Sequence, residues 1–412
     1  MGNDQRTLDR AGRDSSLALG HLQGREMMDR DELYESLRVV IGRGRNELLT
    51  GRASRLFRHE ATTRLLTNMF TEREAELVVS CFDSCGEALT GEELAQKAGI
   101  PEDELRAVFD DMDHKGKLLK IGRKRYMLLP YIPSASERYF IRRRDDPEKM
   151  KRVAEAQLEL FKAGLIDELS AGGYSQFRVI PSIEPVERTI DVNASVEVEN
   201  EILPYELLED HIARVEPQVF AVIPCPCRSA AELAGKPCER ASENYCTVAG
   251  PAAEHMVKEG IGREVTREGL LALMKRAEAD GLVHQTTNIQ DRTMFICNCC
   301  PCCCPYLISR KKFLDNGASA KSDFLPVIDD EVCTLCEDCV DVCPMEAIYH
   351  HWPHKPDGSD DFIRVRTEVC IGCGDCASVC PVEAISLKKT GAARPLATHV
   401  DMVEYIAEKQ KH

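Results

Sequence analysis

The sequence predicts an α+β protein that is built from several domains. The chain has 412 residues, which is enough for roughly two to four domains. Helical periodicity dominates the first 170 residues, and short apolar runs typical of strands begin in the segment that follows. Of the 20 cysteines, all but Cys81 and Cys85 lie between Cys225 and Cys380. The second half of the chain is therefore where metal or thiol chemistry is expected.

The composition argues against several classes of function. The net charge of −16 disfavours general nucleic-acid binding, because a phosphate-binding face must be basic, and it suits docking to basic partners. The longest apolar runs, such as "VFAVIPC", are far too short to span a bilayer, and the N-terminus lacks an apolar signal core. We therefore expect a cytoplasmic protein without a membrane span. In that reducing compartment, spaced cysteines indicate metal binding more often than disulfides.

The N-terminal third predicts a helical lead-in and a small helix-and-hairpin unit. Residues 1–70 are expected to begin with a mobile polar tail, over residues 1–27, and to continue as a helical lead-in. Residues 71–135 contain three amphipathic helices, in "TEREAELVVSCFDSC", "TGEELAQKAG" and "PEDELRAVFDDMDHKG". The second has a capping box from Thr90 to Glu93, and "KLLKIGRKRYMLLP" then reads as a hairpin that turns at Gly122. This order resembles a winged helix.

Winged helices often bind DNA, but the charge pattern here argues against that role. Only the hairpin is basic, whereas the third helix carries carboxylates at Glu102, Asp103, Glu104, Asp110, Asp111 and Asp113. Because such a helix face repels phosphate, we expect this unit to bind protein rather than nucleic acid. Cys81 and Cys85 stand four apart on the first predicted helix. Core packing is the favoured interpretation of this pair, and a redox thiol pair is the alternative.

A connector and a cysteine-rich module follow. Residues 136–200 are interpreted as a connector, with a helix that begins at Pro147 and strands in "FRVIPS" and "TIDVNASVEVE". In the module, residues 201–324, "PYELLEDHIARV" predicts a helix and "QVFAVI" a buried strand. Two further helices are expected before the cysteine-dense run, with Thr266 as an N-cap and Gly281 as a stop. Residues 391–412 are expected to form a C-terminal helix.

The module holds ten cysteines, many of them in "ICNCCPCCCP" at 296–305. Apolar packing does not require cysteines to be adjacent to one another or to alternate with proline, so we expect metal binding. The pattern fits two further iron–sulfur clusters, one cluster plus zinc, or one non-cubane cluster. Adjacent cysteines in an extended chain point to opposite faces and can serve two centres. The expected ligands are Cys225, Cys227, Cys238, Cys246, Cys297, Cys299, Cys300, Cys302, Cys303 and Cys304.

Three other polar residues of the module are candidates for a site. Arg228 follows the buried strand at once, and it is placed to offset an anionic cluster or to bind a substrate anion. His255 and His284 are expected to be packed or surface side chains. Of the two, His284 is the better candidate ligand, because it stands just before the cysteine-dense run.

Residues 325–390 contain the same cysteine spacing twice. Both "CTLCEDCVDVCP" and "CIGCGDCASVCP" read C-x2-C-x2-C-x3-C-P, and they continue into the similar tails "MEAI" and "VEAI". This spacing is that of cysteines around [4Fe–4S] cubanes, whereas structural zinc would not need the repeated register. In two-cluster ferredoxins, the fourth cysteine of each motif binds the other cluster. One cluster would then use Cys333, Cys336, Cys339 and Cys380, and the other Cys370, Cys373, Cys376 and Cys343.

These motifs resemble the bacterial two-[4Fe–4S] ferredoxin domain, and both match it in full. A long insert between them, "YHHWPHKPDGSDDF", departs from that domain and is expected to be a surface loop or an extended hairpin. It holds His350, His351, His354 and the only tryptophan, Trp352. Residues 200–390 as a whole resemble uncharacterised 4Fe–4S ferredoxin-type proteins of anaerobic prokaryotes. That resemblance implies iron–sulfur electron transfer rather than a named reaction.

The sequence shows no dinucleotide-binding, ATP-binding or hydrolase motif, so a chain that holds clusters needs a redox partner protein. The leading hypothesis is a protein that relays single electrons through two C-terminal [4Fe–4S] clusters, to or from an upstream cysteine-rich metal centre or a partner oxidoreductase. A second hypothesis is an oxidoreductase subunit with a catalytic metal or thiol centre at 225–304. A third is a redox-sensing winged-helix transcription regulator.

Overall fold

The structure is a computed structural model. It describes residues 28–42, 59–170, 175–193, 206–243, 245–291, 293–313, 317–351, 361–391, 395–398 and 401. The predicted mobile tail at 1–27 lies outside the described residues, as do most of the predicted C-terminal helix, Trp352 and His354. None of the helices within the described ranges is long and apolar enough to cross a membrane. Mixed helix and sheet content fits the predicted α+β class.

The N-terminal unit consists of helices and one small sheet. Its first elements are α1 (Arg30–Gly42), α3 (Glu60–Met69), α4 (Glu72–Cys81), β1 (Ala88–Thr90), α5 (Gly91–Ala98), α6 (Glu102–Lys115), β2 (Leu119–Ile121) and β3 (Arg125–Met127). The strands pair antiparallel in the order β1-β3-β2, and Gly122 turns the β2–β3 hairpin in a left-handed conformation. The predicted capping box of α5 is present, since Thr90 and Glu93 bond reciprocally to each other's backbone N–H groups.

The helices of the next segment pack into the same apolar core. They are η2 (Tyr131–Ala135), α7 (Ser136–Arg142), α8 (Pro147–Ala163) and α9 (Leu165–Ser170). Asp146 caps α8 by accepting a hydrogen bond from the Lys149 N–H, and Pro147 occupies the first turn, as predicted. Side chains from Leu33 to Ile166 share this core, so α1 and α3 are part of the folded unit.

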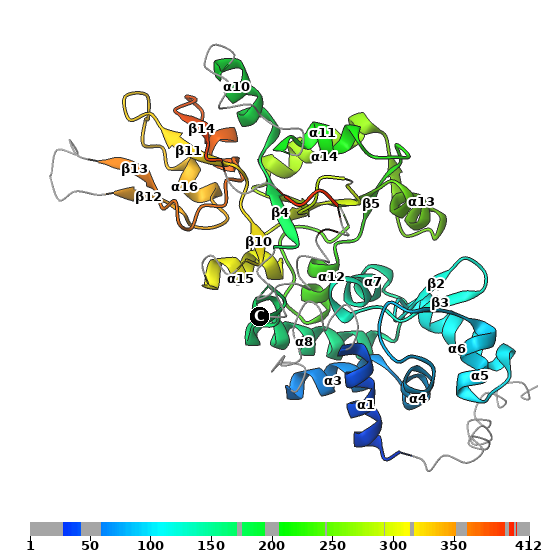
Figure 1. The fold of residues 1–412 in the computed structure, drawn as a ribbon. Coiled ribbons are helices and arrows are strands. Elements are labelled where there is room, and N and C mark those ends of the chain that lie inside the picture. Colours follow the sequence, from blue (N-terminus) through cyan, green and yellow to red (C-terminus); the bar gives the residue numbers. More distant parts are fainter. Residues whose placement is uncertain are drawn as a thin grey trace, which may run out of the picture.

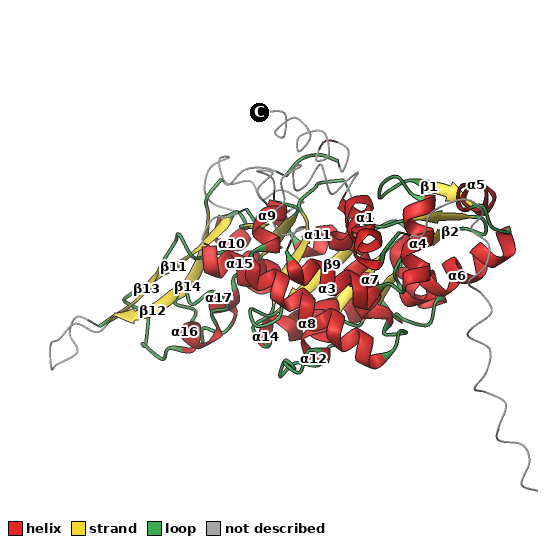
Figure 2. Ribbon diagram, turned by 90° about the horizontal axis from the view of Figure 1, so that it is seen from below, coloured by secondary structure: helices red, strands yellow, loops and turns green. Residues whose placement is uncertain are grey.

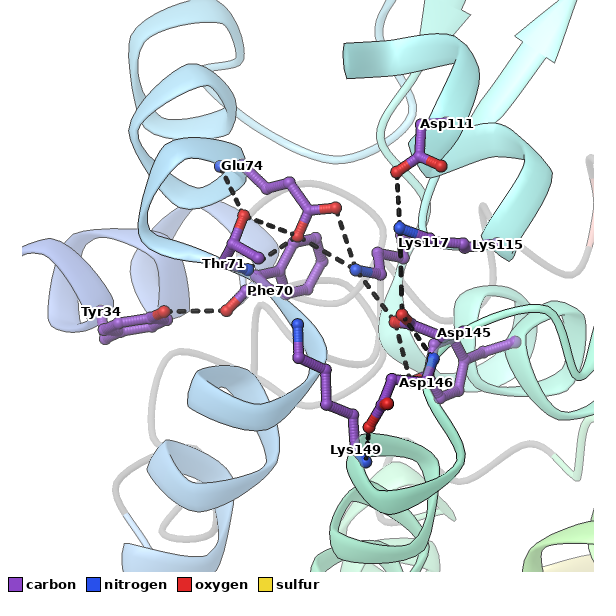
Figure 3. Close-up of polar contacts among 11 residues, drawn as sticks. Tyr34, Phe70, Thr71, Glu74, Asp111, Lys115, Lys117, Asp145, Asp146 and Lys149 are labelled. Atoms are coloured by element: carbon purple, nitrogen blue, oxygen red, sulfur yellow. Dashed lines mark hydrogen bonds and ion pairs between the residues drawn. The ribbon is translucent and has the colours of Figure 1, made fainter. Parts of the chain in front are cut away.

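A buried lysine joins three parts of the N-terminal unit. The Nζ atom of Lys117 lies 2.9 and 3.0 Å from the two carboxylate oxygens of Glu74 and 3.1 Å from a carboxylate oxygen of Asp145 (Figure 3). The Lys117 side chain is only 1% exposed. Its charge is therefore balanced within the protein, by carboxylates from α4 and from the α7–α8 turn.

Cys81 and Cys85 do not share a helix face, which corrects the prediction. α4 ends at Cys81 because Phe82 is extended and its ring stacks on Phe109, with ring centroids 5.9 Å apart. The Cys81 thiol donates to the carbonyl oxygen of Leu94, and the Cys85 thiol donates to that of Ile41. Burial raises the pKa of both thiols to about 12. Both are buried in the core, in keeping with the packing interpretation.

The central module is built on a seven-stranded sheet within the described residues, with the strand order β10-β4-β8-β9-β6-β5-β7. β10 and β4 pair in parallel, and the other neighbours are antiparallel. The strands are β4 (Phe177–Ile180), β5 (Phe220–Ile223), β6 (Cys246–Ala249), β7 (Arg263–Val265), β8 (Val283–Thr287), β9 (Phe295–Cys299) and β10 (Ser319–Ala320). The helices are α10 (Ile183–Asn193), α11 (Leu208–Ala213), α12 (Pro226–Leu233), α13 (Pro251–Lys258), α14 (Arg267–Ala279) and α15 (Pro305–Phe313).

Most predicted elements of this module are present, and one is wrong. β5 is fully buried, Thr266 caps α14, and Gly281 follows it in a left-handed conformation, as predicted. The predicted strand in "TIDVNASVEVE" is wrong for residues 189–193, which belong to α10. Its remaining residues lie outside the described part of the chain.

The C-terminal region consists of two hairpin-like strand pairs and two short helices. β11 (Phe324–Ile328) pairs antiparallel with β14 (Ile385–Lys389), and β12 (Ile348–His351) pairs antiparallel with β13 (Phe362–Val365). Between them lie α16 (Asp338–Val342) and α17 (Asp375–Ser378). Figures 1 and 2 show this region and the α5–α6 unit at opposite ends of the molecule, with the central sheet between them.

Candidate metal centres

Two cavities in the C-terminal region are each lined by four cysteines. Cavity I is lined by Cys333, Cys336, Cys339 and Cys380, together with apolar side chains such as Ile328 and Ile385. Cavity II is lined by Cys343, Cys370, Cys373 and Cys376, together with Met345 and Ile371. Each cavity therefore takes three cysteines from one motif and the fourth from the other motif.

The two binding loops have the same backbone shape but are built from different residues. In the first motif, Leu335 and Glu337 on either side of Cys336 have φ values of 56° and 67°. In the second motif, Gly372 and Gly374 take the corresponding places, with φ values of 70° and 86°. This left-handed backbone is easy for glycine and strained for other residues. Its presence at Leu335 and Glu337 as well indicates that both motifs need the same loop shape for their function.

Backbone N–H groups donate to the cysteine sulfurs in both halves. The N–H of Ala347 lies 3.2 Å from the Cys343 sulfur, and the N–H of Ala384 lies 3.2 Å from the Cys380 sulfur. The N–H of Gly372 also donates to the Cys370 sulfur, at 3.4 Å. Such bonds stabilise anionic thiolates. Four sulfurs around an apolar cavity, with amides that face them, fit a [4Fe–4S] cluster in each cavity.

The insert between the motifs extends the β12–β13 hairpin. His350 is largely buried, and its Nδ1 atom lies 2.6 Å from a carboxylate oxygen of Glu337, beside cavity I. The ring of His351 stacks on Phe362. Neither histidine lines cavity I or cavity II. The His350 contact holds the hairpin against the first motif, and the His351 contact joins the two strands of the hairpin.

Six of the ten upstream cysteines gather at one end of three neighbouring strands. Cys246 opens β6, and Cys297 lies opposite it on β9, one step beyond the Thr247–Ile296 pair. Cys299 ends β9, on the same face as Cys297, and Cys225 follows β5. Helix starts supply the other two, because Cys227 lies in the first turn of α12 and Cys304 precedes α15. We call this set the six-thiol group.

Thiol–thiol contacts run through the whole six-thiol group, in the order Cys227, Cys225, Cys246, Cys297, Cys299 and Cys304. Hydrogen bonding from Cys227 holds the pKa of Cys225 well below its usual value. Hydrogen bonding from Cys246 lowers the pKa of Cys297 to about 6. Hydrogen bonding to neighbouring thiols and burial raise the pKa of the other four, Cys227, Cys246, Cys299 and Cys304, well above the usual value. Thiolates bind soft metals, so Cys225 and Cys297 are the members of the group best prepared to bind one.

The other four cysteines form a second, tighter cluster, which we call the four-thiol group. It consists of Cys238, Cys300, Cys302 and Cys303, whose sulfur atoms all lie within 4.8 Å of one another. The Cys238 sulfur lies 3.7 Å from that of Cys300 and 3.4 Å from that of Cys302. Along the cysteine-dense run, Cys299 and Cys300 therefore belong to different groups, which is the two-sided arrangement that the sequence allowed.

Arg228 is buried between the two groups. It is 2% exposed, so it is not available to bind a substrate anion from solvent, and one of the two roles considered for it is not supported. Its Nη2 atom donates to the carbonyl oxygen of Asn298, at 2.9 Å, and its plane lies over the Tyr245 ring. Burial opposes its charge, but the thiols of Cys225 and Cys300 outweigh this and raise the pKa of Arg228. The role that remains is to offset negative sulfur.

His284 is a structural side chain in this fold. Its Nδ1 atom lies 2.6 Å from the side-chain oxygen of Asn298, and its Nε2 atom lies 3.0 Å from a carboxylate oxygen of Glu278. Both ring nitrogens are thus occupied, and the prediction that His284 is the better candidate ligand is not supported. The same Glu278 oxygen accepts the Ile183 N–H. His284 therefore connects the cysteine-bearing strand β9 to α14 and, through Glu278, to α10.

The central module and the C-terminal region meet at cavity II. The Ser182 N–H donates to the carbonyl oxygen of Cys373 at 2.8 Å, and the Ser182 hydroxyl donates to Asp375 at 2.9 Å. Cys299 and Cys304 of the six-thiol group pack in the same apolar cluster as Cys370 and Cys373 of cavity II. The two sets of thiols therefore belong to one continuous apolar core. Local sequence patterns do not predict this contact, because the two sets of cysteines are about 70 residues apart along the chain.

Comparison with known families agrees with the C-terminal cavities. Residues 332–384 match the family described as 4Fe-4S dicluster domain, and this segment includes both cysteine motifs. Comparison with curated proteins and with solved structures gives no match. The C-terminal region is thus a 4Fe–4S ferredoxin-type region, which, with the many cysteines, suggests iron–sulfur electron transfer.

Proposed function

We propose that this protein relays single electrons between a partner protein and an upstream iron–sulfur centre. Cys333, Cys336, Cys339 and Cys380 would hold one [4Fe–4S] cluster in cavity I, and Cys343, Cys370, Cys373 and Cys376 a second in cavity II. Such clusters accept and release one electron at a time when bound. The six-thiol group would hold the upstream centre.

The observation that carries this proposal is the continuity of the three thiol sets. Cys343 lies in two apolar clusters at once. One of these clusters contains Cys333, Cys339 and Cys380 of cavity I, and the other contains Cys299 and Cys304 of the six-thiol group. The sets therefore form a series in which cavity II stands between cavity I and the upstream thiols. Neighbouring thiol sets that share an apolar core are the arrangement that short-range electron transfer needs.

The surface around cavity I supports a docking role for that end of the series. Cys336 is exposed there, and so are the apolar side chains Val327, Val332 and Val382. The same segments also carry exposed carboxylates, at Asp329, Asp330, Glu331, Asp338 and Asp341. Apolar contact inside a negative rim suits a redox partner with a basic face, whose approach the rim would accelerate.

We further propose that the N-terminal unit is a winged-helix-like protein-interaction domain, at 71–135, followed by a connector, the cysteine-rich module and the ferredoxin domain with the predicted boundaries. Its three helices and its β1-β3-β2 sheet support this. The acidic character of α6 supports protein rather than DNA as its partner. Because this unit lies far from cavity I, it would position the protein without entering the electron path (Figure 1).

The test is reduction of the anaerobically purified protein by two donors of different size. Iron and sulfide counts should show about 8 Fe from the C-terminal cavities, plus the iron of the upstream centre. A reduced two-cluster ferredoxin should reduce the wild-type protein completely. In the Cys376→Ser variant, in which cavity II is damaged, this donor should still reduce the centre in cavity I while the upstream centre stays oxidised. Dithionite, which is small, should reduce both.

Cys85→Ser is the matched control, because Cys85 is a buried thiol with no thiol neighbour, and it should behave as the wild type. Purified protein without iron would overturn the proposal. So would a Cys376→Ser variant whose upstream centre is reduced by ferredoxin at the wild-type rate, since cavity II would then not lie on the path.

A further inference from the structure

The four-thiol group differs from every other set of cysteines in the spacing of its sulfurs. All four sulfurs of Cys238, Cys300, Cys302 and Cys303 fall within 4.8 Å of one another, and three of the sulfur pairs are 3.4 to 3.7 Å apart. Among the residues that the structure describes, no other group of three or more His, Cys, Asp or Glu side chains meets that limit. In cavities I and II, which lie in the region matched to the 4Fe–4S family, no three of the cysteine sulfurs lie within 4.8 Å of one another.

Sulfur spacing distinguishes a single metal ion from a cluster. Four thiolates that bind one ion tetrahedrally, with bonds of about 2.3 Å, have sulfurs about 3.8 Å apart. In a cubane, each thiolate binds a different iron at a different corner, so the sulfurs must stand well outside contact with one another. The four-thiol group matches the first arrangement, and the cysteines of cavities I and II match the second.

Local geometry supports a site that the protein's own ligands complete. Cys300, Cys302 and Cys303 lie in one tight turn, which the Cys304 N–H closes by donating to the carbonyl oxygen of Cys300 at 3.1 Å. Cys238 reaches them from the loop after α12, and its sulfur accepts the Arg240 N–H at 3.4 Å. The ligand set is thus complete from the protein, as in structural zinc sites, which leave no open position.

The second observation is the buried cation beside the group. Two nitrogens of Arg228, Nε and Nη1, lack a hydrogen-bond partner within the described part of the chain. A guanidinium this deeply buried requires nearby negative charge. After burial, the largest effects on it come from the thiols of Cys225, Cys300 and Cys246. Cys300 is the member of the four-thiol group among them, and four thiolates around a divalent ion, with a net charge of −2, would place negative charge beside this cation.

We propose that Cys238, Cys300, Cys302 and Cys303 bind one zinc ion, as a structural centre separate from the electron-transfer path. Thiolate sites favour zinc over ferrous iron in intrinsic affinity, and zinc has no redox chemistry of its own. The ion joins the α12 loop to the turn between Cys299 and Cys304. It therefore fixes the two ends of that turn, which are the thiols that pack against cavity II. This inference does not depend on the proposed function.

The test is a metal count on the wild-type protein and on two single-cysteine variants. Their substituted cysteines lie two residues apart in the cysteine-dense run. The wild type should contain one zinc per chain. Cys302→Ser should lose that zinc and keep its iron, because Cys302 belongs to the four-thiol group. Cys304→Ser should keep its zinc and lose iron, because Cys304 belongs to the six-thiol group. Cys85→Ser should retain both metals.

X-ray absorption at the zinc edge of the wild-type protein gives a readout that does not depend on how the variants fold. It should show four sulfur neighbours at about 2.3 Å. Wild-type protein without zinc would overturn the inference, and so would mixed nitrogen or oxygen ligation. A Cys302→Ser variant that loses about four iron atoms would instead assign a cubane to this group. If the chain proves unable to transfer electrons but holds the zinc, only the proposed function fails.

Discussion

Gly372 faces the carbonyl oxygen of Phe324 so closely that a Cβ atom on Gly372 would lie 2.2 Å from that oxygen. The hydroxyl of Ser322 lies equally close, and it donates a hydrogen bond of 2.6 Å to the carbonyl oxygen of Gly372. The loop of the second motif therefore packs directly against the chain that enters β11. Glycine is required here for space as well as for its φ of 70°.

Gly372→Ala should displace the loop that carries Cys370 and Cys373. The clash is with backbone, which cannot rotate away, so cavity II should lose its shape. The protein should then contain about four fewer iron atoms. Gly391→Ala is the control, since Gly391 has a similar φ of 67° but no atom within 4 Å of the added Cβ. It shares only the backbone cost, of about 1 kcal/mol, and should keep its iron. Equal iron contents in the two variants would contradict the steric argument.

Lys117→Met should strongly destabilise the N-terminal unit. The substitution leaves Glu74 and Asp145 buried without their shared cation, and breaking a buried pair in this way costs about 3–5 kcal/mol. Lys97→Met removes an exposed pair with Asp83 instead and should cost about 1 kcal/mol or less. Urea unfolding followed by far-UV circular dichroism measures both. Similar midpoints for the two variants would mean that Lys117 is better solvated than its burial indicates.

The sequence predicts the elements and motifs whose signals are local. The capping box at Thr90, the hairpin turn at Gly122 and the cysteine spacing of the two C-terminal motifs each lie within a short stretch, and each is present in the structure. α10 is different, because its β-branched residues favour a strand while the fold makes them helical. Local propensity is a weak guide where tertiary packing decides.

The division of the upstream cysteines was beyond the reach of sequence reasoning for a physical reason. Cys246 meets Cys297 only because β6 pairs with β9, and that register joins residues about 50 positions apart. Cys238 likewise joins Cys300 and Cys302 across about 60 residues. The alternation along the dense run indicated two faces, but it contained no information about which distant cysteine each face would meet.

Cys81 and Cys85 should not react with iodoacetamide in the folded protein at pH 8. Burial raises the pKa of both thiols to about 12, so almost none of either is the reactive thiolate, and both are out of reach of solvent. Peptide mapping by mass spectrometry should find both unlabelled until denaturant is added. Labelling of the native protein, or a Cys81–Cys85 disulfide after mild oxidation, would restore the redox-pair interpretation.

Asp323 should make the protein less stable as the pH rises from about 4 to about 7. Burial raises the pKa of this carboxyl to about 7, so between these limits the folded state binds more protons than the unfolded state. The stabilisation is complete below the pKa that Asp323 has in the unfolded chain. It is lost as the pH rises through the pKa of Asp323 in the folded protein. Melting temperatures at pH 5 and pH 8 should therefore differ less for Asp323→Asn than for the wild type.

The comparison concerns the change with pH, because Asp323→Asn also weakens the buried contact with Arg178, 3.1 Å away, at every pH. Asp330→Asn is a suitable control, since it removes a carboxylate from an exposed pair with Arg364. An Asp323→Asn variant with the full wild-type dependence on pH would show that other groups are responsible.

The full-length protein should not shift duplex DNA in a gel at low salt. The Nζ atom of Lys120, in β2, lies 2.7 Å from an Asp110 carboxylate oxygen, and Asp103 and Asp111 are exposed on the same helix as Asp110. Phosphate would meet negative charge along α6, and non-specific binding depends almost entirely on neutralising phosphates. Replacing Asp103, Asp110 and Asp111 with Asn should raise binding, in a way that falls steeply with added salt. Tight, sequence-selective binding by the wild type would instead support the transcription-regulator hypothesis.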